Sequence, residues 1–266
     1  MTADPRDLVK AGDLAGALTA LQARVRADPG DARLRIFLFQ LLCVLGDWPR
    51  AIAQLKLCAE LDAAALPMAQ TYREAIICEV FREKVFAGEK APLFLGEPPE
   101  WLALLAEALM RQGGDAGAAA DLRARAFDAA PASPGTLDGA AFDWIADADS
   151  RLGPVFEAIV DGKYFWIPFT ALSAIEFDPP ADLRDAVWTA CRLTFASGGG
   201  SVALTPTRYP GTAASGSDAE KLARATGWTE LGGDSFAGCG QRLFALPEGD
   251  AALLDMRALR LDPAGG

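Results

Sequence analysis

The N-terminal part of the sequence repeats itself at a fixed interval. Gly12-Asp13 recurs as Gly46-Asp47, an offset of 34 residues, and Gly114-Asp115 follows three such intervals after the first copy. The matching positions of the first two copies are Ala17 and Ala51, Leu18 and Ile52, Leu21 and Leu55, Val25 and Ala59, and Asp28 and Asp62. In the third copy Ala119, Phe127 and Pro131 match Ala17, Val25 and Pro29. This internal similarity predicts an array of repeated structural units.

A period of this length, with a Gly-Asp turn and a small residue five positions after the glycine, is typical of tetratricopeptide helix pairs. Apolar spacing also predicts helices over 5–11, 67–87 and 101–110. Because Pro92, Gly96, Pro98 and Pro99 break the period between the second and third copies, we expect an array interrupted in its middle. Stacked repeats leave a concave surface for a peptide or a helix, so the repeat favours a binding module over an enzyme.

After Pro131 the pattern changes to short apolar runs separated by turns. Two runs around Asp161-Gly162 predict a β-hairpin over 155–169. Further strands are expected within 173–177, 186–195, 201–206, 228–231, 241–246 and 253–259, with Gly198-Gly199-Gly200 joining two of them, and one helix within 217–226. The predicted fold is α+β: a tetratricopeptide-like helical domain over 1–131, then a small, mostly β domain over 132–266, a curved sheet or partial barrel.

Composition excludes several classes of function. The net charge of −11 argues against binding to nucleic-acid phosphates, and the chain has no histidine, which removes Ser-His-Asp and Cys-His catalysis and imidazole zinc sites. No apolar run is long enough to span a bilayer, and the polar start, residues 1–6, lacks the order of a secretion signal. Five widely spaced cysteines, three of them in apolar helical patterns, predict buried free thiols and a cytoplasmic protein.

One acidic cluster lies near the expected domain junction. Asp143, Asp147, Asp149 and Glu157 carry the oxygen ligands that a divalent cation prefers. Local pairing is favoured over a metal site, because Asp149 can pair with Arg151 and Asp147 can bond nearby backbone N–H groups. An enzyme of the C-terminal half, with Asp147, Asp149 and Arg208 around a metal or a phosphorylated ligand, remains the alternative function.

Four other features have both a functional and a structural interpretation. Arg208, beside Tyr209 on a proline-bounded loop, could clamp a partner's carboxylate, but a structural tie to an Asp of the sheet is favoured. The glycines at 198–200 are not followed by Lys-Ser/Thr and indicate a hairpin connector, and Cys239 has no second cysteine nearby in sequence. The exposed arginines of the first repeat also have two interpretations, which are equally favoured. They are solvated surface charges, or they line the edge of a groove and recognise an acidic partner: Arg24, Arg26, Arg33 and Arg35.

Both halves together resemble the ImpE family, also called TagJ or SciE, of bacterial type VI secretion accessory proteins. The resemblance covers nearly the whole chain and joins two unlike halves in the same order. It is carried by Gly12 to Pro29, Arg35 to Trp48, Ala69 to Ala75, Gly96 to Leu102, Phe142 to Pro154, and Pro206 to Pro210.

The resemblance implies a cytoplasmic, non-enzymatic adaptor. Members of this family bind the N-terminal segment of the small contractile-sheath subunit and are linked to the ClpV-type ATPase that dismantles contracted sheath. It implies no catalytic, cofactor-binding or metal-ligating residue, and it does not identify the partner-binding residues. We therefore expect the helical half, or the cleft between the halves, to capture an amphipathic helix of the sheath subunit.

Overall fold

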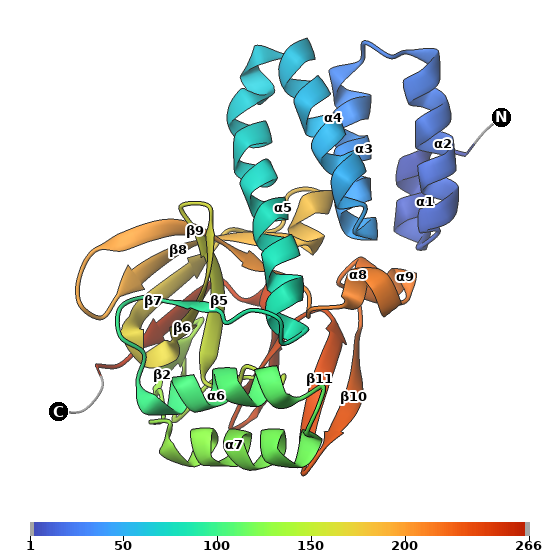
Figure 1. Ribbon diagram of the computed structural model, residues 1–266. Coiled ribbons are helices and arrows are strands. Elements are labelled where there is room, and N and C mark those ends of the chain that lie inside the picture. The colour runs from blue at the N-terminus through green and yellow to red at the C-terminus, as the bar shows by residue number, and fades with distance from the viewer. Residues whose placement is uncertain (1–2, 264–266) are drawn as a thin grey trace.

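The structure is a computed structural model that describes residues 3–263; positions 1–2 and 264–266 lie outside the described part. It begins with a row of five helices (Figure 1): α1 (Pro5–Ala11), α2 (Leu14–Ala27), α3 (Ala32–Leu45), α4 (Trp48–Leu61) and α5 (Leu66–Phe86). A single 3-10 turn, η1 (Ala63–Ala65), precedes α5. The helices pack side by side, as the repeat predicts.

The repeated Gly-Asp pair marks the end of one helix and the start of the next. Gly12 and Gly46 end α1 and α3 with φ of 81° and 73°, backbone angles that glycine adopts without steric cost. Asp13 and Asp47 then accept backbone N–H groups of the following helix at Gly16 and Arg50, which satisfies donors left without an intrahelical partner. The repeat therefore fixes the helix boundaries locally.

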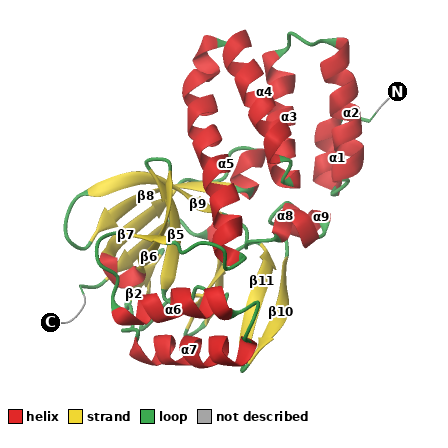
Figure 2. Cartoon of the chain, viewed as in Figure 1, coloured by secondary structure: helices red, strands yellow, loops and turns green. Residues whose placement is uncertain are grey.

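The third copy folds into the predicted helix pair but does not continue the row. The pair consists of α6 (Glu100–Arg111) and α7 (Ala116–Ala129), which lie beneath the strands of the C-terminal half in Figure 2. The ring of Phe127 fills the space beside Gly153, and Ala120 approaches Gly233. The irregular segment 88–99 between α5 and α6 redirects the chain, so the array is interrupted where the sequence predicts.

The C-terminal half is mostly β and its sheets are open. The largest sheet has nine strands in the order β1-β6-β5-β9-β8-β7-β14-β2-β3, and β10-β11 and β13-β12-β4 form two smaller sheets. The strands are β1 (Leu93–Phe94), β2 (Gly135–Leu137), β3 (Ala140–Phe142), β4 (Ala146–Asp147), β5 (Val155–Val160), β6 (Lys163–Pro168), β7 (Leu172–Phe177), β8 (Trp188–Phe195), β9 (Gly200–Pro206), β10 (Thr226–Gly232), β11 (Ser235–Gly240), β12 (Leu243–Leu246), β13 (Gly249–Ala252) and β14 (Ala258–Leu261). This confirms the predicted α+β class.

Several local predictions are confirmed and two are wrong in detail. Strands β5 and β6 form the predicted hairpin, with Val160 opposite Lys163 across Asp161-Gly162, and the glycine segment joins antiparallel β8 and β9. The helix expected within 217–226 is present as α9 (Asp218–Lys221), which is shorter than predicted, and a second short helix before it, α8 (Thr212–Ser215), was not predicted. The strand expected from Leu253 begins only at Ala258, after a 3-10 turn, η4 (Leu253–Asp255). Two further 3-10 turns are η2 (Phe169–Ala171) and η3 (Leu183–Ala186).

One hydrophobic core runs through both halves of the chain. It joins side chains of α1 to α7 with β5, β6, the start of β8, and Leu222, while a second core lies within the β half. The predicted boundary at 131/132 falls in the loop between α7 and β2, and β1, from the first half, pairs in parallel with β6 of the second. No helix within residues 3–263 combines the length and apolarity needed to cross a bilayer.

Candidate functional site

The face of the helical row nearest the sheets is covered by the chain itself. η3 and the first residue of β8 pack against α3 and α5. The Trp188 ring lies 6.0 Å from Trp48 and 5.8 Å from Tyr72, and the Arg184 guanidinium lies 4.8 Å from the Tyr72 centroid. These contacts occupy a surface that an open repeat array would offer to a ligand.

A buried ionic network joins α5 to the sheet at this junction. Arg82 binds Glu157 through two bonds, Nε to Oε1 at 2.6 Å and Nη2 to Oε2 at 2.8 Å. It also donates to Glu79 Oε2 at 3.4 Å. Trp188 Nε1 donates to Glu79 Oε1 at 3.1 Å, and the Tyr164 hydroxyl donates to Glu157. These side chains are buried, so their charges are compensated by one another instead of by water.

The network continues through Arg242 to one of the sequence-predicted acidic residues. Arg242 Nη2 and Nε donate to Asp147 Oδ2 at 2.7 and 2.9 Å, and its Nη1 lies 3.4 Å from Glu157 Oε2. With Arg208, the junction buries three guanidinium groups against three carboxylates, Glu79, Asp147 and Glu157. Ion pairs and hydrogen bonds within the junction therefore replace the water that these polar groups lose on burial.

The pKa shifts in this network follow from burial and pairing. Burial alone would raise the pKa of Glu157, but Arg82 and Arg242 outweigh it and hold the pKa below its ordinary value. Burial raises the pKa of Glu79 and raises that of Asp147 to about 7, although Arg242 favours the charged form. Burial lowers the pKa of Arg208 to about 10, so this arginine is still charged at neutral pH.

The predicted acidic cluster does not assemble into one site. Asp149 pairs with Arg151 and accepts the backbone N–H of Gly238 at 2.9 Å. Asp147 accepts the backbone N–H of Asp149 at 2.9 Å, besides pairing with Arg242, while Asp143 is exposed. Within residues 3–263 no three acidic or cysteine side chains are grouped to hold a metal ion. Asp147 and Asp149 therefore make local pairs, the interpretation that the sequence favoured over a metal site.

Arg208 is a structural tie, as expected, but its partner was predicted wrongly. Instead of an Asp of the sheet, it binds carbonyl oxygens: Val44 at 2.8 Å, Cys43 at 3.4 Å and Lys221 at 2.6 Å. The first two belong to the C-terminal turn of α3, where carbonyls lack intrahelical partners and the helix dipole favours a cation. Arg208 therefore attaches the C-terminal half to the end of a helix of the repeat.

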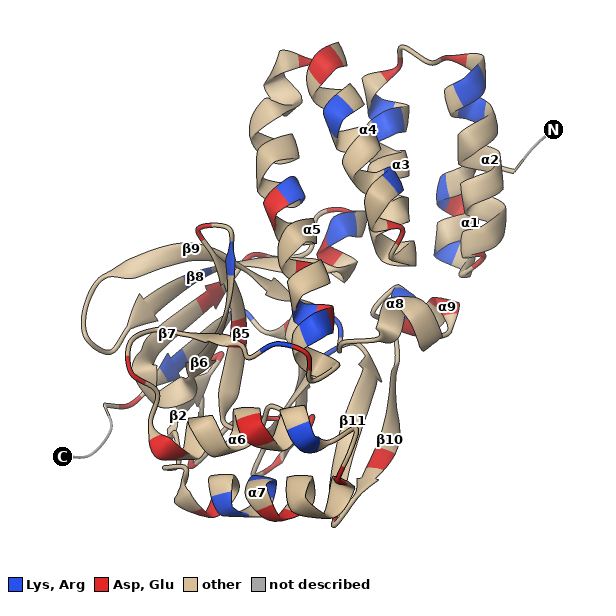
Figure 3. Ribbon diagram, viewed as in Figure 1, with Lys and Arg blue, Asp and Glu red and all other residues tan. Residues whose placement is uncertain are grey.

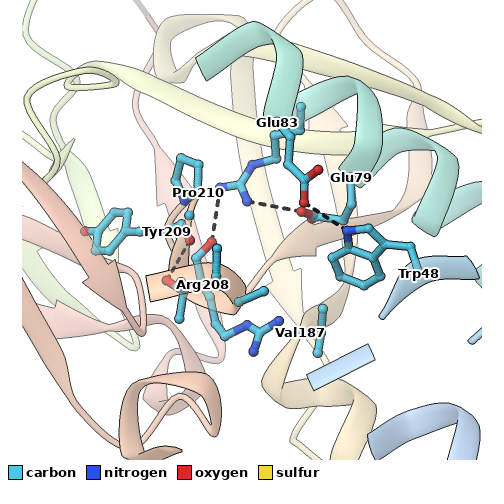
Figure 4. Close-up of a pocket in the computed structure, with 12 residues that line it drawn as sticks. Trp48, Glu79, Glu83, Val187, Arg208, Tyr209 and Pro210 are labelled. Atoms are coloured by element: carbon cyan, nitrogen blue, oxygen red, sulfur yellow. Dashed lines mark hydrogen bonds and ion pairs between the residues drawn. The ribbon is translucent and has the colours of Figure 1, made fainter. Parts of the chain in front are cut away.

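A small cavity lies beside this tie (Figure 4). It measures about 210 Å³ and lies between α4, α5 and the 208–214 segment. Trp48 Nε1 donates to Glu83 Oε1 across its wall at 2.9 Å. Because Glu79, Arg82 and Arg208 in the wall are bonded to protein groups, the cavity presents few free polar groups and is a feature of the junction.

A larger and more apolar groove lies between α4 and α5. Its volume is about 460 Å³. On α4 it is lined by Ile52, Leu55, Lys56, Ala59 and Glu60, and on α5 by Leu66, Ala69, Gln70 and Arg73. On each helix these positions recur every three to four residues, so each helix contributes one stripe of its surface. Leu66 is 48% exposed, and the alanines in the stripes leave room for an apolar side chain.

The remaining sequence-predicted residues lie on the surface or in the core. Arg24 pairs with Asp4 at 3.1 Å, Arg35 donates to Pro29 O and Gln54 Oε1, and Arg26 and Arg33 are exposed. Figure 3 shows the Lys and Arg positions along α1 to α4. Cys43, Cys58, Cys78 and Cys191 are buried free thiols and Cys239 is half-buried.

Sequence reasoning missed the ionic network because its members are distant in the chain. A signal was nevertheless present in α5, where Glu79 and Arg82 continue the helical stripe of Tyr72 and Ile76. Charged residues at core positions of a helix indicate buried partners. Their partners, Glu157 and Trp188, come from β5 and the first residue of β8, which no local pattern connects to α5.

Comparisons with known proteins cover almost the whole chain. The tetratricopeptide repeat model matches residues 8–72, and the model described as ImpE protein matches residues 139–260. The chain is 52% identical over 258 residues to the type VI secretion system accessory component TagJ of Pseudomonas aeruginosa, covering 97% of this chain and 90% of that protein. It also resembles the crystal structure of protein VPA1032 from Vibrio parahaemolyticus, with a TM-score of 0.88, 26% identity and 97% of each chain covered. With this identity over almost its full length, the chain belongs to the ImpE family, whose member TagJ is its relative.

Proposed function

We propose that this protein is a non-enzymatic adaptor of a type VI secretion system that works in the cytoplasm. It binds the N-terminal helix of the small contractile-sheath subunit and is linked to the ClpV-type ATPase in sheath recycling. The proposal is supported by the 52% identity to a type VI secretion accessory component, by the helical repeat, and by the open α4–α5 groove.

The α4–α5 groove carries this proposal because it is suited to an amphipathic helix. Its walls are two parallel stripes of apolar and small side chains, while Lys56, Glu60 and Arg73 lie along its rim. A helix that presents apolar residues at i, i+3, i+4 and i+7 would bury them here and keep its polar face in water. The concave surface that tetratricopeptide arrays usually offer to a ligand is less available here, because η3 and Trp188 already pack against it.

The alternative function, an enzyme around Asp147, Asp149 and Arg208, is disfavoured by the state of those residues. Asp147 and Asp149 are paired with Arg242 and Arg151, and Arg208 already donates to three carbonyl oxygens. A metal or a phosphate ester would have to displace buried ion pairs, which is costly. Binding of either would raise the melting temperature by mass action, so a stabilisation by millimolar Mg²⁺, Mn²⁺ or phosphate would support the enzyme instead.

The test measures binding of a labelled N-terminal peptide of the cognate sheath subunit to the full-length protein by fluorescence anisotropy. Leu66→Asp should weaken binding by about tenfold or more, because it places an unpaired carboxylate against the apolar face of the peptide helix. The matched control is Ile77→Asp, also on α5 and 47% exposed but outside the groove, which should leave the affinity unchanged.

The outcomes separate the function from the site. Saturable binding that both substitutions leave intact would keep the adaptor and move its site elsewhere. No binding of the peptide to the folded wild-type protein would contradict the adaptor function itself. We propose that residues 1–131 and 132–266 are two structural units, a helical half and a β half. Because the two halves share one hydrophobic core, the test uses the full chain.

A further inference from the structure

A second surface hollow lies at the other end of the helical row. It measures about 450 Å³ and is bounded by α1, α3 and the segment that leads into η3. Its lining side chains are Arg6, Arg33, Ile36, Phe37, Gln40, Ala181, Asp182 and Leu183. None of these residues belongs to the α4–α5 groove, so the two features can be occupied independently.

Two guanidinium groups in this hollow form no salt bridge within residues 3–263, although Arg6 lies near enough to Asp4 that its backbone N–H and then its charge lower the pKa of that carboxyl. Arg6 lies with its guanidinium 5.9 Å from the centroid of the Phe37 ring, a contact that holds the side chain over the apolar floor. Within residues 3–263 neither Arg6 nor Arg33 forms an ion pair, whereas nearby Arg24 is paired with Asp4. Two arginines without a salt bridge in one hollow form a local positive charge on a chain whose net charge is −11.

The third polar group of the hollow is the amide of a largely buried glutamine. Gln40 is only 8% exposed, it lines the hollow, and its carboxamide has no hydrogen-bond partner among the described residues. Its amide atoms reach the solvent of the hollow, since the fully buried side-chain atoms without a partner in the described part of the chain belong to Arg123 and Arg184. A ligand that supplies a backbone carbonyl or N–H group would satisfy the amide.

The acidic residue of the hollow does not cancel the two arginines. Asp182 is already paired with Arg184 Nη2 at 2.9 Å and accepts the backbone N–H of Arg184 at 3.0 Å. The lining therefore has a positive excess, an apolar floor of Ile36 and Phe37, and one free amide. This combination matches a peptide, which carries carboxylates, apolar side chains and backbone amides together.

We propose that this hollow binds an extended acidic segment of a protein partner, a second docking surface independent of the sheath helix. Carboxylates on the segment pair with Arg6 and Arg33, since Arg binds carboxylates in a bidentate manner. An apolar side chain between them packs on Phe37, and the backbone of the segment bonds Gln40. The interaction depends on ionic strength, because its cations are exposed.

The test uses a fluorescein-labelled peptide pool in which one central apolar residue is flanked on each side by two Asp or Glu residues. A control pool carries Asn and Gln at the same positions. The acidic pool should bind the full-length protein saturably, and the Arg6→Gln/Arg33→Gln double variant should weaken that binding by about tenfold or more. The matched control, Arg26→Gln/Arg50→Gln, removes the same charge from the same helical row and should keep the affinity.

Gln40→Leu separates recognition from folding. It should weaken the binding of the acidic peptides severalfold while the melting temperature stays nearly the same, since the amide forms no hydrogen bond within the described protein that the substitution would remove. Equal binding of both pools, equal weakening by the two double variants, or no binding of the acidic pool would overturn the proposal. Saturation by free succinate at lower concentration than the peptides would also overturn it, since the hollow would then be a small-molecule site.

Discussion

Arg82 forms charge-assisted bonds to two carboxylates and also donates to the backbone carbonyl of Arg208 at 3.1 Å. Removing one partner from such a set leaves another charge buried and uncompensated, which destabilises by about 3–5 kcal/mol. At the scale of the residue, the junction is therefore sensitive to single substitutions that would be nearly neutral at the surface.

Glu157→Gln should show a characteristic pH dependence. The pKa of Glu157 lies below its ordinary value of 4.5 in the folded protein. Its charge therefore stabilises the fold above about pH 4.5, and this contribution is lost as the pH falls through the folded pKa. The variant should lose about 3 kcal/mol of unfolding free energy at pH 7, and the difference should shrink below pH 4.

Urea unfolding of both proteins between pH 3 and pH 7 measures this. Glu176→Gln is the matched control, because Glu176 forms only exposed pairs with Arg192 and Arg260 and should change the stability little at any pH. A destabilisation by Glu157→Gln that is constant with pH would show that the loss comes from packing and not from the charge.

Ala51→Asp tests the packing inside the repeat. Ala51 is completely buried and its small side chain allows α3 and α4 to approach closely. A carboxylate there has neither space nor a partner, so we expect a loss of several kcal/mol and a lower melting temperature, measured by circular dichroism. Ala51→Gly is the comparison that keeps the space. A melting temperature equal to the parent's would contradict the repeat register.

At the scale of the element, turns and helix ends follow from the sequence because they are local. Gly46 ends α3 and Asp47 starts α4 through contacts within a few residues, and Asp161-Gly162 forms a tight turn by its own backbone preference. The stacking of a helix pair is not local. The α6–α7 pair repeats the pattern of the first copies but packs on strands, because segment 88–99 directs it there.

Gly46→Ala should weaken the junction as well as the helix end. A methyl group at this positive φ is strained, and it would meet the Cβ of Ala213 on α8 at 2.6 Å. Gly12→Ala is the matched control, because Gly12 has a similar φ but open space around its Cβ position. Thermal unfolding should therefore show a larger decrease in melting temperature for Gly46→Ala than for Gly12→Ala. Equal decreases would indicate that α8 moves to make room for the methyl group without loss of stability.

At the scale of the whole molecule, the fold class was predictable but the joining of its halves was not. The change from helical to strand patterns after Pro131 separates the two parts in the sequence. However, the contacts that join the halves connect residues far apart in the chain. They include the bonds of Arg208 to α3, the packing of Trp188 on Trp48, and the pairing of β1 with β6. The α4–α5 groove was likewise unpredictable, because it depends on which helix follows α5 in space.

The shared core predicts that the full chain unfolds in one cooperative step. A fragment of residues 1–131 would expose the apolar side chains of α3 and α5 and leave Glu79 and Arg82 without Glu157. We expect it to bind the dye ANS and to lose a sharp calorimetric transition. Two separate transitions in the full chain, or a fragment that melts sharply, would show that the halves fold independently.

The buried ionic network also limits how the two halves can evolve. Glu79 and Arg82 belong to the helical half, and Glu157, Arg242 and Asp147 to the sheets, so no member can drift without a matching change across the junction. A chimaera that joins one half to a partner half without the matching charges would leave a buried charge uncompensated. The stability of such a chimaera should return only when all the charged residues of the network are restored. The two halves are therefore expected to be inherited together.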